Sequence, residues 1–266
     1  MSSGVYLFCL TPGTPRPELT GTGIDALSPL AAEPLAGVVA ITAAVSLEDF
    51  RGPEARARLA DLAWVAPRAR RHEEVILSIL RQAPVLPVRF GSVFSGLAAL
   101  AAALEPHRAA LAGFFLETAG QQEWALKAYV DLPAARARLL ATRLATEQAQ
   151  LAGLPPGKRY FQEQKIKTQV DLETRAWLRG VTDEITALVA PVSTTTAAGR
   201  LLAADLTGRA DEMIYHAALL VRVEDVERLH GLTAVWNAGH ASLGLQLEAS
   251  GPWPPYHFTP VLNTQG

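Results

Sequence analysis

The chain has little cysteine and no long apolar run, and each shortage excludes a class of protein. Cys9 is the only cysteine in 266 residues, so no disulfide can form within the chain, which is typical of a reducing cytoplasm. The longest apolar run, 35–45, is shorter than the roughly 20 residues of a membrane-spanning helix, and its Val and Ile content predicts a buried strand. The first residues lack the basic flank of a signal peptide, so we expect a cytoplasmic location.

An excess of charge of either sign is also missing. The 24 Lys and Arg residues nearly balance the 26 Asp and Glu residues, which leaves a net charge of −2. This balance argues against nucleic acid or an anionic membrane as an electrostatic partner. The hydrophobic share of 49% and the charged share of 19% are instead typical of a soluble globular protein with substantial cores.

Sequence motifs of catalysis and cofactor binding are incomplete where they occur. The segment 21–26 loosely matches a dinucleotide-binding pattern, but it does not directly follow the first predicted strand. The segment 153–158 resembles a phosphate-binding loop, yet Arg159 stands where Ser or Thr is required, and two prolines remove donor amides. The six histidines show no metal-binding spacing, and no Gly-x-Ser-x-Gly element occurs. We therefore expect no catalytic, cofactor-binding or metal-binding residues, and a function other than catalysis.

The predicted strands and helices place the chain in the α+β class with two domains. In the first half, apolar runs predict two buried strands, helical periodicity predicts one long helix, and Ala- and Leu-rich stretches predict one or two more. A strand-like segment between them contains Pro87, which limits it to a sheet edge or a bulge. In chain order these elements cover 5–10, 38–45, 61–82, 85–94 and 97–117.

The second half has the order β-α-β-β-α-β, which is the pattern of a ferredoxin-like domain, here with an enlarged helical crossover. Strands are predicted over 123–131, 199–205, 212–223 and 243–249, and helices over 133–153, 158–190 and 226–236. A short polar break at 119–122 separates the two halves. We therefore expect an N-terminal α+β domain over 1–119, a ferredoxin-like domain over 120–250 and a tail over 251–266.

The tail concentrates proline and aromatic residues in a chain that is only 7% aromatic. Three prolines within 250–258 exclude helix and central strand, and a stiff segment loses little entropy when it docks. We expect Trp253, Tyr256 and Phe258 to pack back on the body as structural residues. We expect a structural role for His72 as well, because it shares the apolar face of the long helix in the first half.

Two segments are candidates for binding a partner. Pro87 suits a sheet edge, where backbone groups stay available for strand addition; Arg89 can then anchor a carboxylate, while Phe90 and Phe94 supply apolar area. The alternative is that these three side chains are internal to the domain. The second segment is a basic stretch that fits either a solvated helix face or a charged docking surface for a protein. Its cationic residues are Lys158, Arg159, Lys165 and Lys167.

Five segments together resemble the gas vesicle protein F/L family. They are 72–75, 85–94, 123–131, 157–161 and 251–258, and their order and spacing cover most of the chain. The Leu-Pro-x-Arg-Phe-Gly and Gly-Pro-Trp-Pro-Pro-Tyr elements are the most specific of them. The resemblance implies an accessory protein of gas vesicle formation that is cytoplasmic, associates with the vesicle and contacts the small, very hydrophobic shell protein. It also implies an N-terminal α+β domain, a modified ferredoxin-like domain and a C-terminal tail.

These inferences predict an assembly factor rather than an enzyme. A shell protein that lines a gas space presents an apolar face, and exposed apolar patches aggregate. The expected function is to bind shell subunits and cover that face before they polymerise, with other gas vesicle accessory proteins as further candidate partners and no cofactor. One alternative is a minor structural component that is retained on the shell. A second is a small-molecule enzyme, because ferredoxin-like folds host many chemistries.

Overall fold

Two compact units make up the protein. The computed structural model describes residues 3–203 and 208–262. Contacts along the chain divide it into unit 1, which is Met1–Gln122 with Pro252–Gly266, and unit 2, which is Glu123–Gly251. Both units combine helices with a β-sheet, which confirms the α+β class. No helix in the described residues has the length and the apolar composition needed to cross a membrane.

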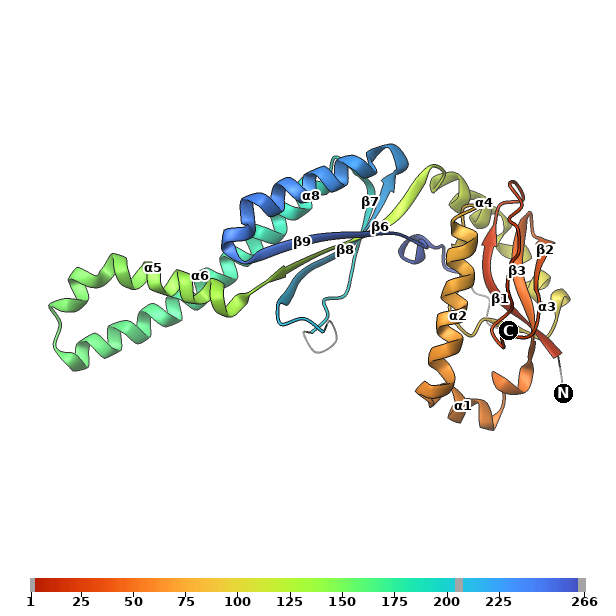
Figure 1. The fold of residues 1–266 in the computed structure, drawn as a ribbon, viewed down its shortest axis with the longest axis horizontal. Helices are drawn as coiled ribbons and strands as arrows, with labels where there is room; N and C mark the ends of the chain where they lie inside the picture. The colour runs from red at the N-terminus through yellow and green to blue at the C-terminus, as the bar shows by residue number, and fades with distance from the viewer. Residues whose placement is uncertain (1–2, 204–207, 263–266) are drawn as a thin grey trace. The chain divides into compact units, whose positions relative to one another are not determined.

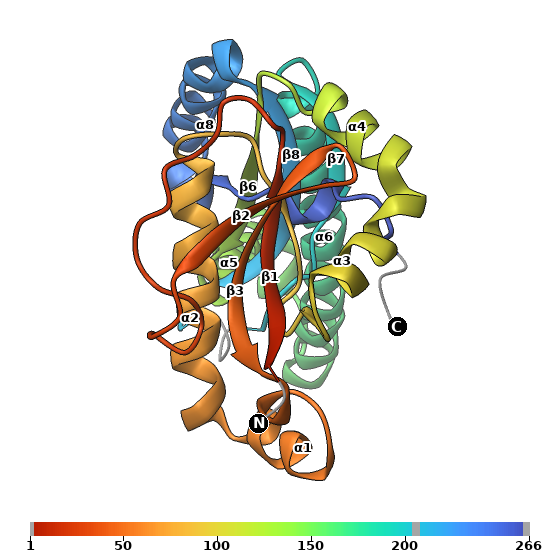
Figure 2. The same cartoon turned by 90° about the vertical axis from the view of Figure 1, so that its right-hand side faces the viewer.

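Unit 1 contains a five-stranded sheet between two helical layers. Its strands are β1 (Ser3–Thr11), β2 (Leu30–Leu35), β3 (Val38–Ser46), β4 (Leu86–Pro87) and β5 (Val93–Phe94). Its helices are α1 (Pro53–Ala60), α2 (Leu62–Leu80), α3 (Leu97–Leu104) and α4 (Arg108–Glu117). The strands lie in the order β2-β3-β1-β4, and β5 also pairs with β1. Figure 2 shows α2 along one side of this sheet and α3 and α4 along the other.

β1 is buried on both faces because it runs through the middle of the sheet. Tyr6 and Phe8 join the hydrophobic cluster on the side of α2, while Leu7 and Leu10 join the cluster on the side of α3 and α4. This two-sided burial explains why the sequence of the strand is a continuous apolar run. The register with β3 shifts between Leu7 and Cys9, and this β-bulge leaves Phe8 and Cys9 on the same side of the sheet.

Unit 2 has the strand order of a ferredoxin-like domain. Its strands are β6 (Gln121–Val130), β7 (Ser193–Ala198), β8 (Glu212–Arg222) and β9 (Leu245–Trp253). Its helices are α5 (Leu132–Ala152), α6 (Pro156–Val189) and α8 (Val226–His240). The order across the sheet is β7-β8-β6-β9, so the first and third strands of the unit lie in the centre. This order is the one that the split β-α-β pattern of the sequence predicts.

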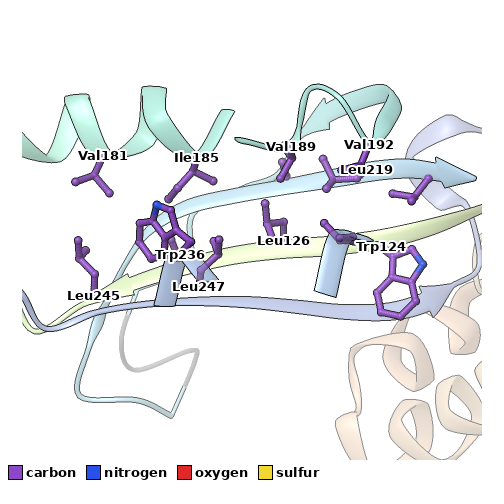
Figure 3. Packing of buried hydrophobic residues seen from close by; sticks show 14 of the residues in the cluster. Trp124, Leu126, Val181, Ile185, Val189, Val192, Leu219, Trp236, Leu245 and Leu247 are labelled. Atoms are coloured by element: carbon purple, nitrogen blue, oxygen red, sulfur yellow. The ribbon is translucent and has the colours of Figure 1, made fainter. Parts of the chain in front are cut away.

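The core of unit 2 lies on one face of its sheet. In Figure 3, Val181 and Ile185 of α6 point onto the strands, above Leu126 of β6, with Trp236 of α8 beside them. These side chains are buried in one cluster that also includes Leu219 of β8. Burying a large apolar side chain contributes about 1.5–3 kcal/mol, so this cluster is the main source of stability in the unit.

The helix pair α5–α6 continues beyond the sheet (Figure 1). α6 has 34 residues, a length of about 50 Å at a rise of about 1.5 Å per residue. Only its C-terminal part joins the core over the sheet. Its N-terminal part packs against α5 through a separate small cluster around Leu151, Ile166 and Val170. We call α5 together with residues 156–176 the helical arm.

The predicted strand over 199–205 is wrong. The structure has β7 at Ser193–Ala198, residues 199–203 lie outside any strand, and 204–207 lie outside the described residues. β7 is an edge strand paired with β8, and four of its six residues are exposed. Because solvent reaches both of its faces, its Ser- and Thr-rich sequence has no apolar alternation to reveal it. β2 and α1 also have no predicted counterpart; Pro34 is tolerated in β2 because this strand is an edge too.

Candidate partner-binding surface

Two buried side chains hold residues 88–92, the segment between β4 and β5 that we call the edge loop. The hydroxyl oxygen of Tyr6 lies 2.9 Å from Nδ1 of His72, and it accepts the N–H of Gly91 at 3.1 Å. Nε2 of His72 lies 3.0 Å from the carbonyl oxygen of Val88. Tyr6 belongs to β1 and His72 to α2. The edge loop is therefore fastened to the sheet and to the helix at the same time.

The acceptors around this pair determine which atoms carry the protons. A carbonyl oxygen only accepts, so Nε2 of His72 carries a hydrogen and donates it to Val88. In the neutral imidazole Nδ1 is then an acceptor, and the Tyr6 hydroxyl donates to it while accepting from Gly91. Each contact thus joins one donor to one acceptor. No buried side-chain nitrogen or oxygen in the described residues lacks a partner.

Burial keeps both members of the pair neutral. His72 is 3% exposed, and desolvation lowers its pKa from 6.5 to about 4, although the hydrogen bond to Val88 acts in the opposite direction. Desolvation likewise raises the pKa of the Tyr6 hydroxyl. A proton added to His72 would place a second donor at Nδ1, where the hydroxyl hydrogen of Tyr6 already lies. The neutral pair is therefore the form that holds the edge loop.

A row of aromatic rings leads away from this pair. Phe90 of the edge loop meets His72 edge-on, with 5.9 Å between ring centroids, and Phe50 lies 6.4 Å from Phe90. Trp64, in the first turn of α2, lies 5.6 Å from Phe50. The guanidinium of Arg68 covers the Trp64 ring at 4.0 Å. We call Phe50, Trp64 and Phe90 the aromatic row; all three are half-buried, so each ring keeps part of its surface accessible.

The start of α2 fixes the position of Trp64 in this row. Oδ1 of Asp61 accepts the N–H of Ala63 at 2.9 Å, which caps the helix. From that start, one face of the helix turns toward the sheet of unit 1. Its buried residues are His72, Val75, Ile76 and Ile79. The same helix therefore anchors the edge loop through His72 and presents Trp64 nearer its N-terminal end.

Arginine side chains accompany the aromatic row. Arg89 of the edge loop is exposed, and in the described part of the chain its guanidinium makes no ion pair or hydrogen bond. Arg51 donates to the carbonyl oxygen of Val93 at 3.2 Å, beside the edge loop. Guanidinium groups form charge-assisted hydrogen bonds with carboxylates and stack on aromatic rings. This surface therefore suits a partner that is apolar and carries a carboxylate.

The structure separates the three side chains predicted to bind a partner. Arg89 is exposed and Phe90 is half-buried. Phe94 is 7% exposed and belongs to the cluster with α3 and α4, so its placement on a partner surface is wrong. Pro87 does lie in an edge strand. Few backbone groups are available there for the addition of a partner strand, however, because β4 and β5 have two residues each.

Sequence reasoning missed Phe50 and Trp64, which complete the aromatic row. Phe50 follows β3 in a turn, and Trp64 lies at the start of a helix, at the margin of its buried stripe and two turns before the first buried residue of that stripe. Phe50 is outside any helix or strand, and Trp64 precedes the buried repeat, so periodicity marks neither of them. The only available signal is the scarcity of aromatic residues, which form 7% of the chain.

The tail attaches to unit 1 through two buried prolines and the hydroxyl of Tyr256. The prolines 254–255 are buried, and the hydroxyl of Tyr256 donates to Oε2 of Glu73 on α2 at 3.1 Å. Phe258 is half-buried. Trp253, one of the three aromatic residues expected to pack back on the body, is 43% exposed and lies at the end of β9, before the turn that carries Tyr256. The prolines and Tyr256 attach the tail, and Tyr256 is one of the residues for which the sequence predicts this role.

The two cofactor-like segments of the sequence form turns. In 21–26, Oδ1 of Asp25 accepts the N–H groups of Leu27 and Ser28, which closes a turn instead of starting a helix. Of the segment 153–158, residues 153–155 join α5 to α6, and residues 156–158 belong to the first turn of α6. Within 3–203 and 208–262, no group of three or more His, Cys, Asp or Glu side chains is arranged to hold a metal ion.

Known proteins that resemble this chain are gas vesicle proteins. The sequence model of the family described as gas vesicle synthesis protein GvpL/GvpF matches residues 4–260. The chain belongs to this family. A curated relative, gas vesicle protein L of Streptomyces sp. (strain CB03234), is 28% identical over 237 residues, which are 84% of this chain and 80% of the relative.

Solved structures from the family share the fold. The crystal structure of GvpF from Anabaena sp. PCC7120 matches with a TM-score of 0.69 at 20% identity, over 98% of this chain and 97% of that one. GvpF from Microcystis aeruginosa matches with a TM-score of 0.67 at 18% identity, over 97% and 99%. The fold is therefore that of the family over nearly the whole length, and family membership gives the chain a role related to gas vesicles.

Proposed function

We propose that this protein is a non-enzymatic assembly factor that binds the hydrophobic gas vesicle shell protein and covers its apolar face until it polymerises. The observation that carries the proposal is the aromatic row with the exposed guanidinium of Arg89 beside it. Family membership supports the link to gas vesicles. Binding and release of a subunit require no cofactor.

The chemistry of the surface matches the chemistry of such a partner. A subunit that encloses gas presents an apolar face, which aggregates when it is exposed. Half-buried rings offer apolar area for that face, and aromatic and arginine residues are the side chains that most often dominate binding energy at interfaces. The Tyr6–His72 pair holds the edge loop in place before binding, so little conformational entropy remains to be lost.

The proposal places the protein in the cytoplasm, associated with the growing vesicle. The unpolymerised shell subunit is the main partner, and other gas vesicle accessory proteins are further candidates. If the protein were instead a minor component retained on the shell, it would make the same contact without release. Its amount in detergent-washed vesicles distinguishes the two roles: loss on washing supports the assembly factor, and a constant retained fraction supports the structural component.

The direct test is suppression of shell-protein aggregation. Shell protein diluted from denaturant is followed by light scattering with the full-length chain, with Trp64→Ala, and with the control Leu116→Ala. Leu116 is 80% exposed on α4, which covers the opposite side of the sheet. We expect the unaltered chain and Leu116→Ala to delay scattering equally, and Trp64→Ala to delay it less. Equal delay by all three would remove the aromatic row from the proposal.

A further inference from the structure

A second unpartnered surface lies in unit 2, on the outward side of α6, and its role is independent of the proposed function. Six exposed residues succeed one another at alternating spacings of four and three along this helix. They are Phe161, Lys165, Thr168, Leu172, Arg175 and Arg179. This is the spacing at which one helix presents a continuous stripe to another. At about 100° per residue they all fall within an arc of about 80°. We call this stripe the outward seam.

The outward seam is not the face by which α6 packs against α5. That inner face contains Ile166, Val170 and Thr174, which are buried. On the seam, Phe161 is 74% exposed and Leu172 is 56% exposed, so neither packs into the protein. The two lie eleven positions apart, about three turns or about 16 Å along the axis. Large apolar side chains repeated on the same exposed line are typical of a face that meets another helix.

The cations of the outward seam are available for a partner. In the described part of the chain, Lys165, Arg175 and Arg179 make no ion pair. Other cations of the arm are engaged within it, in the pairs Arg136–Asp171, Arg143–Glu147 and Arg159–Glu163. The six residues of the seam include no acidic residue, and the exposed Asp183 follows one turn beyond Arg179. Its charge is therefore positive, although the whole chain has a net charge of −2.

We propose that the outward seam binds an acidic amphipathic helix of a partner protein, which completes a three-helix arrangement with α5 and α6. Apolar residues of that helix pack on Phe161 and Leu172, and its carboxylates pair with the seam cations. A second copy of this chain does not fit, because seam-to-seam pairing would place cations against cations. Nucleic acid does not fit either, since phosphates would use the cations and leave the two apolar side chains exposed.

The test uses the full-length chain and synthetic helical peptides as probes. One labelled peptide of about three heptads carries Leu and Glu on a single face, and a second carries Lys in place of Glu. Their binding is measured by fluorescence anisotropy. The seam variant is Lys165→Glu/Arg175→Glu/Arg179→Glu. The control reverses the same amount of charge at three exposed cations off the seam, as Arg81→Glu/Arg138→Glu/Arg228→Glu.

We expect the Glu peptide to bind the unaltered chain and the control alike, and to bind the seam variant about tenfold more weakly or worse. The seam variant should gain affinity for the Lys peptide. Phe161→Ser/Leu172→Ser should also weaken binding of the Glu peptide, which a purely electrostatic attraction would not. Circular dichroism establishes that all variants keep their helices. Equal losses in the seam variant and the control would overturn the proposal, as would displacement of the Glu peptide by a single-stranded RNA oligonucleotide at equal concentration.

Discussion

The hydroxyl of Tyr6 and the imidazole of His72 share a hydrogen bond across 66 positions of the chain, and the backbone groups around them fix its direction. Neither side chain reaches the surface. Together they nevertheless hold the loop that presents Arg89 and Phe90. The shape of the candidate binding surface therefore depends on two core residues that touch no partner, and changes to them should alter stability first and binding second.

Tyr6→Phe tests the hydrogen bond between Tyr6 and His72. The substitution keeps the ring and removes the hydroxyl, so Nδ1 of His72 and the N–H of Gly91 lose their partner. We expect the free energy of unfolding of unit 1 to fall by about 1–3 kcal/mol. Hydrogen exchange of the β1 amides measures it. Tyr160→Phe is the control, because Tyr160 is 58% exposed and should change nothing; a similar loss in both variants would refute the assigned bond.

The pH dependence of stability tests whether His72 is neutral in the folded protein. His72 has a pKa of about 4 in the folded protein and 6.5 as a free side chain. Between these values the unfolded chain binds a proton that the folded chain excludes, so stability is complete above pH 6.5 and falls as the pH drops toward 4. The expected total fall is roughly 3–4 kcal/mol.

Other groups titrate in the same range, so the measurement is a difference between two proteins. Unfolding of unit 1 is compared at about pH 8 and about pH 5 for the unaltered chain and for His72→Phe. His72→Phe keeps a buried ring that cannot take up a proton. We expect it to be less stable at the higher pH and to lose less on acidification. Parallel losses in the two proteins would contradict the assignment of this fall to His72.

Tyr256→Phe tests how the tail is attached. The substitution removes the hydrogen bond to Glu73, and the expected loss of stability in unit 1 is about 0.5–1.5 kcal/mol. Hydrogen exchange of α2 near Glu73 should rise at the same time. Release of the tail by limited proteolysis gives a second readout. An unchanged protease sensitivity would indicate that the buried prolines 254–255 hold the tail without Tyr256.

The sequence predicts those elements in which one face or both faces are buried in a regular pattern. The sequence of β6 alternates because one face is buried, and Trp124, Leu126 and Val130 lie on that face. The run in β1 is apolar because both faces are covered. β7 has neither signal, since solvent reaches both faces of this edge. The spacing of apolar residues follows burial, so a strand that is exposed on both faces shows no such spacing.

The candidate surface was predictable only in part, because it is assembled from distant segments. Arg89 and Phe90 lie in one motif next to Pro87, so the sequence marks them together. Phe50 and Trp64 come from a turn and a helix end, and only the folded chain brings their rings to Phe90. Phe94 shares the motif but packs on the side of the sheet that α3 and α4 cover. Successive residues of a strand point to opposite faces, so the position of Phe94 in β5 decides which helical layer it meets.

Retention of unpolymerised shell protein by the immobilised full-length chain can be compared between Arg89→Glu and Arg81→Glu. Both residues are exposed arginines of unit 1, and only Arg89 lies beside the aromatic row. We expect about tenfold weaker retention for Arg89→Glu, because a charge-assisted contact is lost, and unchanged retention for Arg81→Glu. Equal retention by the two variants, at equal stability, would contradict the proposed binding surface.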